Sequence, residues 1–148
     1  MEITMSPSAL LKKLLANMFL MYFKAHSYHW NVEGPNFAQY HAFFGDLYTT
    51  LHGNIDTIAE QIRALDVYAP ISLEDLYSAK SISENTARPT TPAEMFESLL
   101  ADNAEVSRSL QAVFDSATNE NNQGLADFAA GLLDAHAKHA WMLKSFTK

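Results

Sequence analysis

Apolar residues recur every three or four positions along four long stretches of the chain, which is the spacing of one buried face of an α-helix. The first stretch begins at Ser6-Pro7, where a capping side chain precedes a proline, and it continues to His29-Trp30. Gly34-Pro35 then interrupts the pattern. The second stretch follows from a possible cap at Asn36 to about Leu65. These features predict two long helices joined by a short link.

The second half of the chain repeats this arrangement. A third helix is expected to start at Thr90-Thr91-Pro92 and to stop at the polar run 119–124. A fourth continues from Leu125 almost to the last residue. Residues 67–89, with a short amphipathic piece near 73–79, read as a long crossover. Two short links and one long crossover predict an all-α, ferritin-like four-helix bundle whose crossover carries a short helix.

Length and composition limit what else the chain can be. Its 148 residues, 48% of them hydrophobic, suit one domain, which we expect to span residues 1–148. No run of eighteen apolar residues occurs, and the first twenty residues lack the order of a signal peptide, so no membrane span and a cytoplasmic location are expected. The absence of cysteine excludes disulfides, thiolate zinc sites and thiol catalysis. Any bound metal must have nitrogen and oxygen ligands.

The charge of the chain argues against a nucleic-acid-binding surface. The formal net charge is −7, and the ten Lys and Arg residues are scattered. The first five residues contain one charged side chain, Glu2, so a Lys/Arg-rich tail is not expected at that end. Because affinity for phosphates comes chiefly from clustered basic side chains, DNA binding is not expected.

Candidate metal ligands lie on the first two predicted helices. His29, His41, Asp56 and Glu60 carry imidazole and carboxylate groups, which are ligand types that hold iron. Asp56 and Glu60 share a helix face, but His41 precedes Asp56 by fifteen residues, which is about 22 Å along a helix. If all four bind one metal, the histidines of one subunit must meet the carboxylates of another across a two-fold interface.

The same residues also have ordinary interpretations. A helical histidine is often a packed residue hydrogen-bonded to a neighbour, and two acids four residues apart often form a solvated face. The sequence has no Glu-x-x-His pair, which disfavours an iron site inside a single bundle. It also lacks a Walker-type loop and a nucleophile elbow. On the residue pattern alone, a metal centre and a packing role both stay open.

A set of residues at fixed spacing surrounds these candidates: His29-Trp30, Gly34, Phe37, His41 and Asp56-x-x-Ala59-Glu60. A second characteristic run stands near the end of the chain: Lys138-His139-Ala140-Trp141-Met142-Leu143-Lys144. Together they resemble the Dps family, the mini-ferritins of bacteria and archaea. The resemblance implies a hollow shell of twelve subunits. In that shell, ferroxidase centres at two-fold interfaces oxidise Fe(II) to Fe(III) with hydrogen peroxide or oxygen, and ferric mineral is stored inside.

Residue matching assigns roles within that centre. The resemblance implies that His29 and His41 of one subunit face Asp56 and Glu60 of its mate, in agreement with the spacing argument. Trp30, beside a ligand, would be placed to take up an electron, or it is an ordinary interface aromatic. The implied activity is that of a ferroxidase.

Two positions depart from the family's pattern. The family usually has an Asp four residues after the second histidine, whereas this chain has Gly45, with Asp46 beside it. The family's Ala-Glu-Arg becomes Ala59-Glu60-Gln61. The first change removes either a second-iron ligand or a group that supports a ligand, and the second removes a cation that could orient a carboxylate, so a weakly bound second iron is expected. The alternative function is a structural or DNA-protecting cage with a weakened or lost centre.

Other polar residues could extend the site. His26, one turn before His29, either supports a metal ligand from behind or is a packing residue. His52, four residues before Asp56, either replaces the missing ligand or is an interface histidine, and Asp46 is a further possible metal residue. The resemblance further implies acidic pores at three-fold axes, near the start of the last helix. The candidates there are Glu120 and Asp127, and the alternative is that both are solvated surface acids.

Two more histidines belong to the last predicted helix. His136 and His139 have no carboxylate partner that the sequence identifies. Core or interface roles are therefore expected for both.

Overall fold

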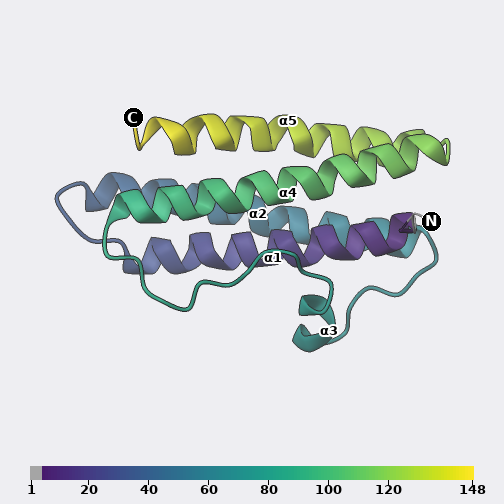
Figure 1. Ribbon diagram of the computed structural model, residues 1–148, viewed down its shortest axis with the longest axis horizontal. Coiled ribbons are helices and arrows are strands. Elements are labelled where there is room, and N and C mark those ends of the chain that lie inside the picture. The colour runs from purple at the N-terminus through teal and green to yellow at the C-terminus, as the bar shows by residue number, and fades with distance from the viewer. Residues whose placement is uncertain (1–4) are drawn as a thin grey trace.

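Five helices make up the regular structure of residues 5–148 (Figure 1). The computed structural model describes residues 5–148, so the residues before Met5, part of the N-terminus expected to lack a basic tail, lie outside it. The helices are α1 (Pro7–Asn31), α2 (Phe37–Ala64), α3 (Leu73–Tyr77), α4 (Pro92–Asn119) and α5 (Gln123–Ser145). No strand occurs among the described residues. The predicted all-α bundle with a short helix in the crossover is confirmed.

Side-chain caps start two of the long helices as the sequence predicts. The Ser6 hydroxyl accepts the backbone N–H of Ala9 at 3.2 Å, and the Thr91 hydroxyl accepts that of Glu94 at 3.2 Å. The prediction that Asn36 caps α2 was wrong, because its side chain accepts no backbone N–H there. A capping residue normally has extended backbone angles, whereas Asn36 has φ −103° and ψ 25°.

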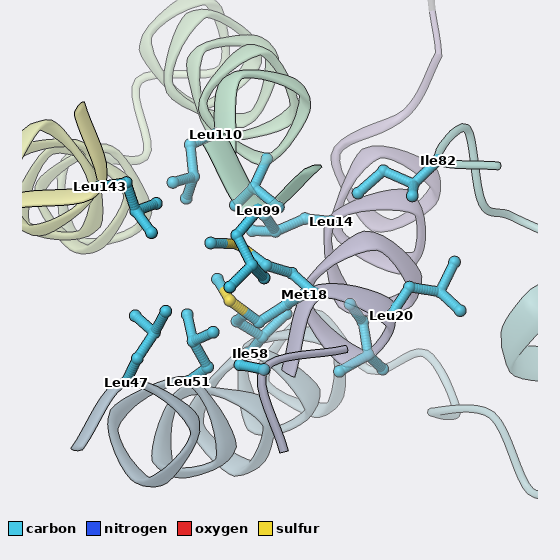
Figure 2. Packing of buried hydrophobic residues seen from close by; sticks show 14 of the residues in the cluster. Leu14, Met18, Leu20, Leu47, Leu51, Ile58, Ile82, Leu99, Leu110 and Leu143 are labelled. Atoms are coloured by element: carbon cyan, nitrogen blue, oxygen red, sulfur yellow. The ribbon is translucent and has the colours of Figure 1, made fainter. Parts of the chain in front are cut away.

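The four long helices surround one apolar core. Helix α1 packs along both α2 and α4, and α5 packs along α4. Figure 2 shows side chains from all four long helices meeting between them, among them Leu14, Met18, Leu51, Leu99 and Leu143. Since each helix contributes one apolar face, burial of these faces accounts for the bundle. None of the described helices has the length and apolar character needed to cross a bilayer.

Asn17 links the long crossover to the bundle through hydrogen bonds. Its amide nitrogen donates to the hydroxyls of Ser81 at 2.9 Å and Ser109 at 3.0 Å. Its amide oxygen accepts the backbone N–H groups of Ser81 at 3.0 Å and Ile82 at 3.1 Å. Both donors and both lone pairs of this buried amide are therefore satisfied. The Asn17 side chain therefore links the crossover segment after α3 to α1 and α4.

Candidate metal centre

The link between α1 and α2 brings two candidate ligands together. His29 lies in the last turn of α1 and His41 lies near the start of α2. Tyr28 and Phe44, which belong to the same two helices, are buried with ring centroids 5.9 Å apart in an edge-on arrangement. This aromatic contact fixes the end of α1 against the first turns of α2.

His29 and His41 hold each other in place, and we refer to this pair as the histidine clasp. Nδ1 of His29 donates to the carbonyl of His41, and Nδ1 of His41 donates to the carbonyl of His29, both at 2.7 Å. The rings are nearly parallel, with centroids 3.7 Å apart and an interplanar angle of 17°. A carbonyl oxygen can only accept, so each Nδ1 carries a proton, and the neutral form of each ring has its lone pair on Nε2. This is the tautomer that binds a metal through Nε2.

The two carboxylates lie farther along α2. Asp56 and Glu60 are exposed and one helical turn apart. The hydrogen bond with Asp56, followed by the charge of that carboxyl, raises the pKa of Glu60. A bound cation would reduce the repulsion between these two neighbouring carboxyl groups.

One chain contains two parts of a possible centre at separate places. Within residues 5–148, no three His, Asp or Glu side chains are grouped so that they could hold a metal ion. The clasp lies at one end of α2, and Asp56 lies fifteen residues beyond His41, about 22 Å along the helix axis, with Glu60 one turn farther on. The chain by itself thus supplies two imidazoles at one position and two carboxylates at another.

An aromatic group lies next to the clasp on the α1 side. The hydroxyl of Tyr22 and Nδ1 of His26 are hydrogen-bonded at 2.9 Å. The His26 ring stacks on Tyr48 with centroids 3.8 Å apart, and the centroid of the Trp30 ring is 4.2 Å from that of His26. Desolvation lowers the pKa of His26, and the neighbouring histidines His29 and His52 lower it further. His26 is therefore engaged with aromatic residues, and its part in metal binding stays a prediction.

Tyr22 and Tyr48 were not singled out from the sequence. Tyr22 precedes His26 by four residues, and Tyr48 precedes His52 by four. A one-turn spacing of this kind places side chains on one helix face, so it is a signal that could have found them.

Four other predicted residues are exposed. His52 packs its ring 4.9 Å from that of Tyr22, and Asp46 lies on the surface of α2. Glu120 follows α4 at the turn into α5, and Asp127 lies in the first turns of α5. A pore lined by Glu120 and Asp127 would need further subunits, so the pore role of these two acids stays a prediction.

The histidines of α5 are core residues. His136 and His139 are 0% and 8% exposed, and their ring centroids are 4.9 Å apart. Nδ1 of His136 donates to the side-chain oxygen of Asn103 at 2.7 Å, and the amide of Asn103 donates to the carbonyl of His136 at 3.0 Å. Sequence reasoning missed Asn103, because nothing in the sequence links two positions thirty-three residues apart on different helices.

Comparison with known proteins agrees with this architecture. A family model described as a ferritin-like domain matches residues 8–148. The chain is 34% identical to the DNA protection during starvation protein of Brevibacillus brevis, over 94% of this chain and 93% of that protein. It is 36% identical to a low temperature-induced protein of Nostoc sp., over 93% of this chain and 77% of that one.

Solved structures show the same similarity. A Dps protein from Bacillus brevis superposes with a TM-score of 0.90 at 33% identity, covering 96% of this chain and 95% of that chain. The Dps protein of Vibrio cholerae O1, described as a member of a broad superfamily of ferritin-like diiron-carboxylate proteins, gives a TM-score of 0.91 at 26% identity. That superposition covers 96% of this chain and 89% of the other. The chain belongs to the Dps family of ferritin-like proteins.

Proposed function

We propose that this protein oxidises Fe(II) at centres shared by two subunits and stores the ferric product inside a hollow assembly of twelve copies. The observation that carries the proposal is the histidine clasp, in which two Nδ1–H···O bonds of 2.7 Å leave both Nε2 lone pairs available. Neutral imidazoles together with carboxylates are suitable ligands for iron.

The carboxylates of the proposed centre come from the partner subunit. Asp56 and Glu60 are too far from the clasp of their own chain, because about 22 Å of helix separates them from it. A two-fold axis that crosses α2 between these two positions would bring the clasp of each subunit to the acids of the other and create two equivalent centres. Membership of the Dps family supports this arrangement.

The proposed reaction balances as follows. Each Fe(II) gives up one electron, and hydrogen peroxide accepts two electrons and two protons to form two molecules of water. Two Fe(II) are therefore consumed for each peroxide. The negative charge of Asp56 and Glu60 favours Fe(III) over Fe(II), because attraction to a carboxylate grows with the charge of the cation. Removal of both Fe(II) and peroxide would limit oxidative damage to DNA without any contact with DNA.

A second candidate function is a cage with a weakened centre. It is favoured by Gly45, which offers no ligand at the position where the family usually has an Asp. Measurement of the Fe(II) oxidation rate and of the number of irons bound per subunit separates this candidate from the first.

Complementation between two inactive variants tests whether the centre is shared. One variant carries His29→Ala and His41→Ala, and the other carries Asp56→Ala and Glu60→Ala. Each variant alone should fail to oxidise Fe(II) rapidly. In a mixed dimer, one of the two centres keeps both histidines and both carboxylates, while the other centre loses all four.

Mixed assemblies prepared by unfolding and refolding the two variants together should recover oxidation in proportion to the mixed dimers formed. Wild-type protein that goes through the same cycle is the control for refolding. A centre built within one subunit would show no recovery, because every chain in the mixture lacks half of its ligands. That result, or rapid oxidation by either variant alone, would refute the proposal.

A further inference from the structure

Gly45 lies against the His29 ring of the histidine clasp. It stands one helical turn after His41 in α2. A Cβ atom built at Gly45 would be 3.1 Å from both Cε1 and Nδ1 of His29, which is closer than the usual contact distance between carbon atoms. In this chain, a side chain at position 45 would therefore require the imidazole of His29 to shift by a few tenths of an ångström.

The backbone gives no separate reason for a glycine there. Gly45 lies within a regular helix and, unlike Gly34 with φ 118°, has no positive φ. Glycine inside a helix is unfavourable relative to alanine, because it loses more conformational freedom on folding. The close approach of the His29 ring is the feature that distinguishes this glycine from one at an ordinary helical position.

We propose that Gly45 is a positioning residue that sets the geometry of the histidine clasp for the proposed iron centre, and this inference rests on the proposed function. A methyl group at position 45 would push the His29 ring outward by a few tenths of an ångström. That movement strains the 2.7 Å bond from Nδ1 to the carbonyl of His41 and tilts the ring away from its partner 3.7 Å away. Nε2 of His29 then no longer points in the same direction relative to Nε2 of His41.

The test compares Gly45→Ala with Gly131→Ala. Gly131 also lies inside a long helix, but a Cβ atom there meets nothing within 4 Å. Both substitutions give the same gain in helix propensity, so they differ in the contact with His29. Three measurements are made on the assembled protein: the urea unfolding midpoint, the crystal structure without metal, and an anaerobic titration with Co(II) followed by its visible absorption spectrum.

Gly45→Ala should assemble and unfold at a urea concentration no lower than the wild type, and so should Gly131→Ala. Only Gly45→Ala should show a displaced His29 ring, a changed Co(II) spectrum and a Co(II) affinity weaker by about tenfold or more, which is the usual effect of disturbing the groups that orient a ligand. The oxidation of Fe(II) is not needed for any of these measurements.

Three results would overturn the inference. They are a Co(II) affinity for Gly45→Ala equal to that of Gly131→Ala, an unmoved His29 ring, or a loss of folding in Gly45→Ala alone, which would make Gly45 a packing residue of the bundle. Failure of the wild type to bind Co(II) would instead refute the proposed function, and the metal-free crystal structures would still decide whether Gly45 sets the clasp.

Discussion

Acid should destabilise this bundle through His136, which is completely buried on α5. Burial first, and the neighbouring His139 second, lower the pKa of His136 from 6.5 to about 3. Its Nδ1 donates a hydrogen bond to the side-chain oxygen of Asn103, and its Nε2 has no hydrogen-bond partner among the described residues. Protonation would therefore place a positive charge inside the core with no carboxylate to balance it.

The direction and the size of the effect follow from this shift. The unfolded chain binds a proton at His136 as the pH falls below about 6.5, whereas the folded chain resists it down to about 3. The part of the free energy of unfolding that depends on neutral His136 is thus fully present above pH 6.5. It decreases by about 1.4 kcal/mol for each pH unit below that value. At pH 4.5 the free energy of unfolding is lower by about 3 kcal/mol per chain. The decrease reaches its maximum, about 5 kcal/mol, near pH 3.

Urea unfolding at pH 7 and pH 4.5 measures this loss. The informative pair of variants is Asn103→Leu and the double variant Asn103→Leu/His136→Leu, because both lack the hydrogen bond between the two side chains. Asn103→Leu should lose about 3 kcal/mol more stability between the two pH values than the double variant does. An equal loss in both variants would show that His136 does not bind the proton that destabilises the fold.

Three further outcomes are expected. Asp56→Ala or Glu60→Ala should slow Fe(II) oxidation by about tenfold or more and leave the size of the assembly unchanged in gel filtration, since both side chains are exposed. Asn17→Leu should lower the free energy of unfolding in urea by about 3 kcal/mol, because the buried N–H of Ile82 and the part-buried N–H of Ser81 lose their acceptor. Asp127→Asn should slow iron uptake at low salt and have little effect at about 0.1 M salt, where the Debye length is about 10 Å. Unchanged uptake at low salt would show that Asp127 does not guide iron.

Local sequence signals predicted the helices, and they failed where the backbone turn departs from the ordinary pattern. Ser6 and Thr91 start their helices as expected, because an extended residue followed by proline favours a side-chain cap. Asn36 has a suitable capping side chain. After the turn at Gly34, however, its backbone angles are not the extended ones that a cap of α2 needs. A residue type alone does not report the backbone angles that capping needs.

Contacts between helices were harder to predict than the helices. The sequence indicated that His29 and His41 belong together, but it did not indicate which nitrogen of each ring carries the proton. That choice is made by two backbone carbonyls, which approach the rings only after the link between α1 and α2 has formed. The pairing of Asn103 with His136 depends in the same way on how α4 and α5 are rotated about their axes.

The separation of the ligands along α2 links the proposed chemistry to assembly. A continuous helix cannot fold back on itself, so His41 and Glu60 stay apart in an isolated subunit. Such a subunit offers iron either two imidazoles or two carboxylates, and each set alone is too small for a tight site. Under the proposed function, rapid oxidation therefore begins only when a second copy is in place. Ferric product then forms where an enclosing shell can retain it.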